Sequence, residues 1–330
     1  MARSAVSEDL SGSACRRRPR FAVAAALLGA AVLAFATGCA SGSQEQSPPP
    51  TGDGAFPVTV QSGPADSSSA VTIGARPTKI VSLSPSATET LWAVGAGDQV
   101  VAVDDKSDYP AGVPTTDLSG FSPNVEAIIG KGPDLVIASD DTGGLVSGLK
   151  AAGVPTLLVP AAANLDEAYG QIERVGSATG HAPEATALTA SMRTEIAEAV
   201  ASVPQSQPRT YFHELDDTLY TITDGTFLGE IYAMVGLRSI ADGGGSGGDY
   251  PQLSAEYVVT ADPDLIFLAD SQCCGITPDK VAARPGWSGL AAVRDKQIHV
   301  LDEDLASRWG PRVVDLVRSI AAAAQPAPAG

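Results

Sequence analysis

Short apolar runs alternate with amphipathic segments along most of this chain. Leu135–Ala138 and Leu265–Leu268 are continuous apolar runs, typical of parallel strands that are buried on both faces. The segment Asn124–Ile129 instead spaces its apolar residues as a helix does. Because strands and helices alternate in this way, the pattern predicts an α/β fold with parallel, doubly wound sheets.

One segment occurs twice in register. Glu126–Asp140 (EAIIGKGPDLVIASD) and Glu256–Asp270 (EYVVTADPDLIFLAD) share the first Glu, the Pro-Asp-Leu triplet and the last Asp, at a constant offset of 130 residues. Each copy is predicted to be an amphipathic helix followed by a buried strand. A period this long excludes a solenoid, whose repeats run to about 20 to 50 residues. It predicts two similar lobes with a cleft between them.

The stretch between the two copies has a helical pattern. Leu188, Met192, Ile196 and Val200 recur at a spacing of four residues, and Gly180–Pro183 interrupts the pattern. We therefore expect two α/β lobes joined by a long interdomain helix, which permits less closure than a loop hinge. The predicted parts are a signal segment, a lipidated N-terminus with a flexible linker, the N-terminal lobe, the connecting helix, the C-terminal lobe and a tail, at residues 1–38, 39–75, 76–164, 165–203, 204–323 and 324–330.

The N-terminus has the pattern of a secretory signal. Arginines at 16–18 and 20 precede the apolar run Phe21–Phe35, which is shorter than the about 20 apolar residues of a membrane-spanning helix. The small residues before Cys39 resemble a bacterial lipobox, although Ala36 replaces its usual Leu, so we expect Cys39 to be lipidated. Simple cleavage and secretion without lipid is the alternative. Residues 40–70, rich in Ser, Gly, Pro and Gln, are predicted to be a flexible tether.

The net charge of the chain limits the kinds of molecule that it can bind. Removing residues 1–38 takes away five Arg and two acidic residues, which brings the formal net charge of −17 to −20. A chain this acidic is not expected to bind nucleic acid.

The folded part keeps only the adjacent Cys273 and Cys274. Outside the cytoplasm this pair can form a vicinal disulfide, or remain two thiols, because adjacent cysteines fit ordinary disulfide geometry poorly.

Five motifs give the chain a resemblance to a known family. They are the opening IVSLSPSATETLWAVGA, Ser107–Pro110, the two Glu…Pro-Asp-Leu units, Arg284–Trp287 and Arg308–Arg312. Over about residues 76–322 the chain resembles the extracytoplasmic substrate-binding proteins of ABC importers for cobalamin and ferric siderophores. The resemblance implies a ligand held between two lobes, no catalysis, no cofactor, and docking onto a permease dimer driven by ATPase subunits. We expect a monomer that is lipid-anchored on the extracytoplasmic face of the membrane.

The resemblance also assigns roles to residues. One Glu on each lobe, Glu126 and Glu256, maps onto the glutamates that pair with permease arginines, and two carboxylates on similar lobes suit a symmetric pair of basic pockets. A Glu in the first turn of a helix can instead simply favour the helix dipole. Loops that follow strands give the expected cleft residues: Ser84, Ser86, Tyr109, Phe121, Tyr250, Asp304, Arg308 and Trp309.

The ligand is expected to be a corrinoid, with a ferric siderophore as the rival. Tyr109 resembles the aromatic position of cobalamin binders, and Asp304 and Arg308 match an acid and a base near that ligand. Ferric siderophores are frequently anionic and favour several convergent cations, whereas the cleft set offers Arg308, Arg312 and little else. This difference favours the corrinoid.

Two other chemistries have weaker support in the sequence. Gly244–Gly248 spells G-x-S-x-G, which would make Ser246 a hydrolase nucleophile with His213 or His299, but the pattern lies in a glycine run without the expected strand and helix. The three histidines are dispersed and share no metal-ligand spacing, so no metal site is expected. His213 beside Glu214, Asp216 and Asp217 is the exception that a structure can test.

Overall fold

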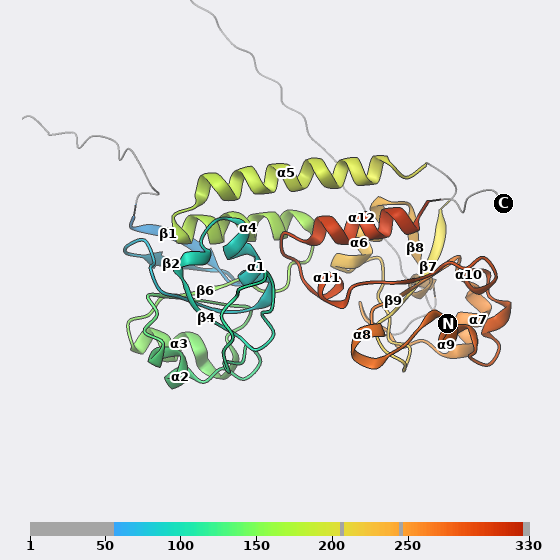
Figure 1. Ribbon diagram of the computed structural model, residues 1–330, viewed down its shortest axis with the longest axis horizontal. Helices are drawn as coiled ribbons and strands as arrows, with labels where there is room; N and C mark the ends of the chain where they lie inside the picture. The colour runs from blue at the N-terminus through green and yellow to red at the C-terminus, as the bar shows by residue number, and fades with distance from the viewer. Residues whose placement is uncertain (1–55, 205–207, 244–246, 326–330) are drawn as a thin grey trace, which may run out of the picture. The chain divides into compact units, whose positions relative to one another are not determined.

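The computed structural model describes residues 56–204, 208–243 and 247–325. The predicted signal segment, Cys39 and Ser246 lie outside the described residues. Two four-stranded parallel sheets organise the described part, one in each predicted lobe (Figure 1). Among the described residues, no helix has the length and apolar character needed to cross a membrane.

The N-terminal lobe is built on a sheet with strand order β4-β3-β5-β6. Its buried strands have almost no exposed side chains, as their apolar runs predict. Three helices connect the strands. The elements are β3 (Ile80–Leu83), α1 (Pro85–Ala93), β4 (Val100–Val103), α2 (Val125–Gly130), β5 (Leu135–Ala138), α3 (Leu145–Ala151) and β6 (Thr156–Leu158).

The C-terminal lobe repeats this topology. Its sheet has the order β10-β9-β7-β8, so in both lobes the first strand lies between the second and the third. The sequence pattern did not predict β8 or the short helices α8 to α11. The elements are β7 (Arg209–Glu214), α6 (Phe227–Met234), β8 (Leu237–Ser239), α7 (Ala255–Ala261), β9 (Leu265–Leu268), α8 (Ser271–Cys274), α9 (Pro278–Ala282), α10 (Ala291–Arg294), β10 (Ile298–Val300), α11 (Glu303–Ser307) and α12 (Val313–Ala323).

The sequence repeat corresponds to equivalent units of the two sheets. Asp134 of the first copy accepts hydrogen bonds from the backbone amides of Thr78 and Lys79 at 2.8 and 2.9 Å. Asp264 of the second copy accepts from the amide of Thr210 at 2.7 Å. Each aspartate therefore fastens the third strand of its sheet to the start of the first strand. The Asp of each Pro-Asp-Leu unit therefore makes an equivalent hydrogen bond in its own lobe.

Two helices join the lobes. α4 (Leu165–Thr179) ends at Gly180, which has a left-handed φ of 82°, and α5 (Ala182–Ala201) then runs back along α4. α5 also packs on α12, as Figure 1 shows. Met192 and Ile196 are buried on the predicted apolar face. The expected helix, break and longer helix are thus present.

The predicted flexible tether is wrong in its second half. β1 (Val58–Ser62) and β2 (Ser69–Ile73) form an antiparallel hairpin, with Val60 and Ile73 buried. Leu158 of β6 donates its amide to the Ser62 hydroxyl at 2.8 Å, so the hairpin is attached to the lobe. The average composition of residues 40–70 concealed the short alternation of apolar and polar residues that forms these strands.

Candidate functional site

A cavity of about 740 Å³ opens at the carboxyl ends of the N-terminal strands, the edge at which open α/β sheets bind ligands. Its volume lies within the range of about 300 to 1,000 Å³ that is usual for small-molecule sites. The lining comes from the end of β3, from the loops after β3, β4, β5 and β6, and from α11 with the segment that follows it. The lining residues used below are Ser84, Ser86, Asp104, Asp105, Lys106, Asp108, Gly120, Phe121, Asp140, Asp304, Arg308 and Trp309.

Six of the eight predicted cleft residues line this cavity. Ser84 and Ser86 are buried at the start of α1, and the Ser86 hydroxyl accepts the backbone N–H of Trp309 at 3.3 Å. Phe121 is 79% exposed at the rim. Asp304, Arg308 and Trp309 reach the cavity from the C-terminal part of the chain.

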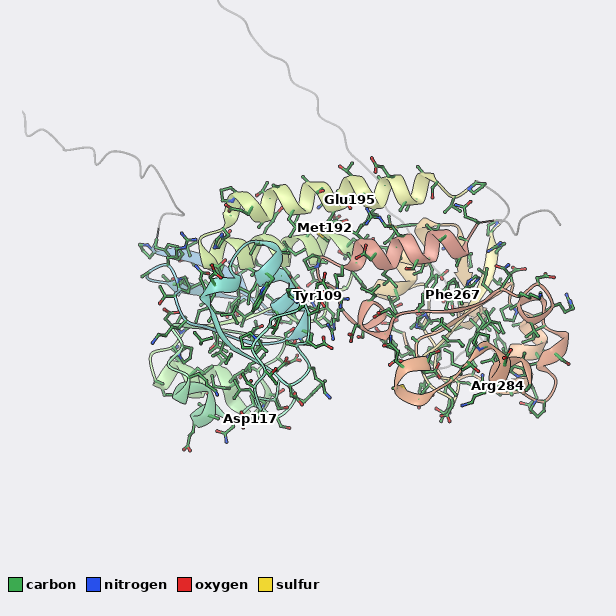
Figure 2. The ribbon with its side chains drawn as sticks, viewed as in Figure 1. Tyr109, Asp117, Met192, Glu195, Phe267 and Arg284 are labelled. Carbon is green, nitrogen blue, oxygen red and sulfur yellow. A yellow bond between two sulfur atoms is a disulfide. The ribbon has the colours of Figure 1, made fainter. Side chains whose placement is uncertain are left out.

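The other two predicted residues lie elsewhere. Tyr109, labelled in Figure 2, belongs to the N-terminal lobe. It lines a neighbouring cavity with Trp92, and its ring is covered by Arg312, whose Cζ lies 4.1 Å from the ring centroid. Tyr250 is exposed in the loop that precedes α7 and is not part of the lining. A position in a loop after a strand does not by itself place a side chain in the cavity, as these two tyrosines show.

Arg308 holds two parts of the site together instead of standing free for a ligand. Its guanidinium donates to Glu89 of α1 at 2.8 Å, to Asp304 at 2.6 Å and to Asp108 at 3.0 Å. Arg312 donates to the same Glu89 at 2.8 and 3.0 Å. The side chains of Glu89 and Arg308 are 2% and 8% exposed, so this is a buried charge cluster between α1 and the chain that follows α11.

The acidic wall of the cavity was not predicted from the sequence. Asp104, Asp105 and Asp108 follow β4, and Asp140, the last residue of the first repeat copy, follows β5. Burial raises the pKa of Asp104. The same rule that selected the loops after strands would have found these residues had it been applied to β4 and β5.

The residue at position 120, beside this wall, has to be a glycine. A Cβ at this position would lie 2.6 Å from the carbonyl oxygen of Leu83 and 2.8 Å from Asp104 Oδ2. Both distances are far shorter than a van der Waals contact, so only glycine allows the loop to pass so close to β3 and Asp104.

A second group of ionisable residues lies at the corresponding end of the C-terminal sheet. Glu214 is fully buried and makes a two-point ion pair with Arg284, at 2.6 and 2.5 Å. Burial and then the charge of Glu214 raise the pKa of Asp270 to about 7. His213 is also fully buried, which lowers its pKa to about 4, and its Nδ1 lies 2.8 Å from the Tyr232 hydroxyl. Within the described residues, no three His, Cys, Asp or Glu side chains are grouped to hold a metal ion.

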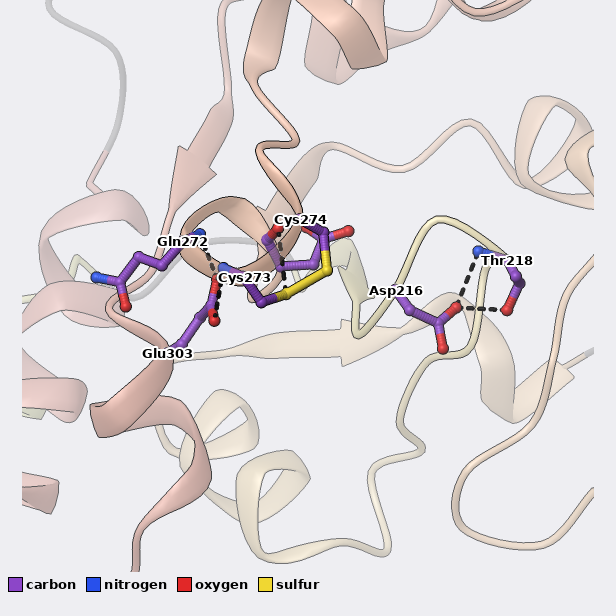
Figure 3. Close-up of a disulfide and its surroundings, with 7 residues drawn as sticks. Asp216, Thr218, Gln272, Cys273, Cys274 and Glu303 are labelled. Atoms are coloured by element: carbon purple, nitrogen blue, oxygen red, sulfur yellow. Dashed lines mark hydrogen bonds between the residues drawn. A yellow bond between two sulfur atoms is a disulfide. The ribbon is translucent and has the colours of Figure 1, made fainter. Parts of the chain in front are cut away.

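The structure joins Cys273 to Cys274 by a vicinal disulfide in α8 (Figure 3). Glu303, the first residue of α11, accepts the backbone N–H of Gln272 and that of Cys273, the latter at 3.0 Å. The disulfide turn is therefore bonded to the short helix that carries Asp304 into the cavity.

Glu126 and Glu256 occupy equivalent places on equivalent helices. Each is the second residue of its helix, behind an N-cap: Asn124 caps α2 and Ser254 caps α7, accepting amides at 3.0 and 3.1 Å. Both glutamates are exposed, and the carboxylate of neither makes a hydrogen bond or ion pair with another described residue. In Figure 1 both helices lie well away from α5.

Comparisons with known proteins agree with this architecture. The family model described as periplasmic binding protein matches residues 80–305. The ABC transporter substrate-binding lipoprotein YvrC of Bacillus subtilis is 33% identical over 321 residues, which are 94% of this chain and 98% of that protein. A cobalamin-binding protein of Halobacterium salinarum is 35% identical over 236 residues, 69% of this chain and 61% of that longer protein.

Solved structures of similar proteins have the same fold. The periplasmic vitamin B12 binding protein BtuF of Vibrio cholerae has a TM-score of 0.63 and 26% identity, covering 76% of this chain and 97% of its own. The periplasmic heme-binding protein RhuT from Roseiflexus has a TM-score of 0.65 and 28% identity, covering 76% and 100%. The chain belongs to the periplasmic binding protein family, as a substrate-binding protein of ABC transporters.

Proposed function

We propose that this protein captures a corrinoid, most simply cobalamin, in the cavity and delivers it to an ABC permease. The observation that carries this proposal is the charge of the cavity wall. Arg308 is already bonded to three carboxylates, which leaves Lys106 as the cation of the described lining without a partner. An anionic ferric siderophore or a haem with its propionates would lack the convergent cations that such ligands favour.

The shape of the cavity suits a bulky ring. Trp309 and the exposed Phe121 supply apolar faces, and the aspartates around them supply acceptors for amide N–H donors at the rim of a corrin. The relatives from Halobacterium and Vibrio are named for cobalamin. A ferric siderophore remains the rival ligand, since other relatives in the solved structures are named for heme and iron.

The secreted-hydrolase alternative has less support. The family is one of transport proteins and not of enzymes. His213, its proposed base, is fully buried and directed at Tyr232, and Ser246 lies outside the described residues.

Delivery requires a docking surface and an anchor. We assign docking to Glu126 and Glu256, because two exposed, unpaired carboxylates on equivalent helices suit a symmetric pair of basic pockets on a permease dimer with its ATPase subunits. We assign the anchor to a lipid on Cys39. Replacing Cys39 by Ala should release the protein from the membrane fraction, and retention after a high-salt wash would contradict the lipid anchor.

A thermal-shift panel tests the ligand class. The mature protein is heated alone and with cyanocobalamin, ferric siderophores or haem, each in excess. A ligand at 100 times its dissociation constant stabilises the folded state by about 2.7 kcal/mol. We expect the corrinoid to raise the melting temperature, and haem and anionic ferric siderophores to leave it unchanged. Stabilisation by a ferric siderophore alone would reject the corrinoid and keep the importer role.

A further inference from the structure

The carboxylates of the cavity wall outnumber its cations. Asp104, Asp105, Asp108, Asp140 and Asp304 line it, against Lys106 and Arg308. Arg308 is 8% exposed and is neutralised by Glu89, Asp108 and Asp304 at distances of 2.6 to 3.0 Å. A bound ligand would therefore meet mainly the negative charge of the aspartates that Arg308 does not neutralise.

Asp105 and Asp140 are the aspartates that remain available. Both are exposed at the cavity, and the side chain of neither makes a hydrogen bond or an ion pair with another described residue. They lie in the loops after two different strands, β4 and β5, so the negative charge is not confined to one loop.

Asp104 indicates independently that a ligand group binds at this wall, because one of its buried oxygens lacks a hydrogen-bond partner. It is 4% exposed, it lines the cavity, and its Oδ1 has no hydrogen-bond partner among the described residues. A Cβ at Gly120 would lie 2.8 Å from the other Asp104 oxygen, Oδ2, so the loop at Gly120 passes close beside this carboxylate. A buried acceptor is normally satisfied. A donor or a positive charge on the ligand would satisfy this one.

We propose that the cavity selects its ligand by charge, favouring molecules that carry a net positive charge and amide donors over neutral or anionic molecules of the same shape. Where the ligand is a corrinoid, the proposal rests on the function proposed above, and the preferred form is the cationic aquacobalamin. For iron chelates, the preferred form is one with a free ammonium group.

Matched pairs of probes separate charge from ligand class. Aquacobalamin, with one positive charge at pH 6, is compared with neutral cyanocobalamin. Ferrioxamine B, whose pendant amine is protonated, is compared with its N-acetylated form. Dissociation constants are measured by calorimetry at 10 mM and 200 mM salt. We expect the cationic member to bind about tenfold more tightly at low salt. The preference should shrink at high salt, because the screening length falls from about 30 Å at 0.01 M to about 8 Å at 0.15 M.

Two variants locate the effect. The double variant Asp105→Asn with Asp140→Asn keeps side-chain shape and removes both unpaired charges, and it should reduce the preference to about twofold or less. Asp295→Asn changes the net charge of the chain in a C-terminal loop outside the lining and should leave the preference intact.

Each outcome decides the question. Equal affinities within a bound pair at low salt, or a preference that survives in the double variant, would overturn charge selection. Corrinoid binding without any preference would overturn it while the corrinoid function stands. Binding of the ferrioxamines alone, with the cationic form preferred, would support charge selection and reject the corrinoid. A protein that binds neither pair would contradict both proposals.

Discussion

Arg308 and Glu89 meet in a buried ion pair, with Nη1 of the arginine 2.8 Å from Oε1 of the glutamate, although 219 residues separate them in the chain. Arg308 follows α11 at the edge of the C-terminal lobe, and Glu89 belongs to α1 of the N-terminal lobe. Arg312 shares the same carboxylate. The cluster fixes how the segment that carries Asp304 and Trp309 meets the cavity.

Replacing Glu89 by Ala should lower the free energy of unfolding by about 3 to 5 kcal/mol, because it removes the buried carboxylate that Arg308 and Arg312 share. Arg312 would then lack a carboxylate partner, and Arg308 would keep only the more exposed Asp108 and Asp304.

Arg238→Ala is the matched control. It breaks an ion pair with Asp224 whose arginine is 59% exposed, and it should cost at most about 1 kcal/mol. Urea denaturation of both variants checks the difference. Equal costs would mean that Glu89 contributes no more than a surface charge.

The buried Asp270 and His213 make stability depend on pH in opposite directions. The pKa of Asp270 is raised to about 7, so the folded state holds more protons than the unfolded state from about pH 4 to 7, and its contribution to stability is lost as pH rises through this window. The pKa of His213 is lowered to about 4, so its contribution is lost as pH falls from about 6.5 to 4.

Asp270→Asn isolates the first of these effects. The Asp270 side chain does not cap α8, so Asn should preserve the local structure. The stability of the wild type relative to this variant should fall steadily between about pH 4 and pH 7. Urea denaturation at a series of pH values measures it. Parallel stability curves for the two proteins would show that Asp270 ionises as an ordinary surface aspartate does.

The double variant Glu126→Ala with Glu256→Ala should abolish cobalamin uptake by cells while the purified protein keeps its affinity. Both side chains lie on α2 and α7 and neither lines the cavity. The matched control is Asp166→Ala with Asp295→Ala, which removes the same charge from other surfaces. Normal uptake by the glutamate variant would contradict the docking role.

The sequence pattern was sufficient for the repeated architecture. Buried strands such as Leu135–Ala138 are continuous apolar runs, and the two Pro-Asp-Leu units perform the same hydrogen bonding in each lobe. The hairpin Val58–Ser62 with Ser69–Ile73 was not predicted, because the composition of the surrounding segment concealed the short alternation in its strands. The first strand of the hairpin packs on β6 and α4.

The cavity was predicted less completely, for a physical reason. Which residues follow a strand can be read from the sequence, but their partners are set by tertiary contacts between distant segments. Arg308 was expected to face the ligand, yet Glu89 and Asp108 occupy its guanidinium. Tyr109 was expected to stack on the ligand, yet Arg312 covers its ring.

Trp309 is an aromatic residue of the described lining whose backbone N–H is bonded to the Ser86 hydroxyl. Truncating it to Ala should weaken cobalamin binding by about 1 to 3 kcal/mol, in the range of good buried contacts. Tyr109→Ala should weaken binding less, because Tyr109 lies outside the cavity. Calorimetry on both variants checks the order, and the reverse order would move the ligand to the neighbouring cavity.

A calorimetric titration of the wild-type protein with cyanocobalamin tests the central claim most directly. We predict saturable binding with a dissociation constant of about 1 μM or lower, equivalent to about −8 kcal/mol or more favourable. The titration should also quench the fluorescence of Trp309, because the coloured ligand would lie against it. The absence of heat and of quenching, in a preparation that binds a ferric siderophore tightly, would contradict the assignment of a corrinoid ligand.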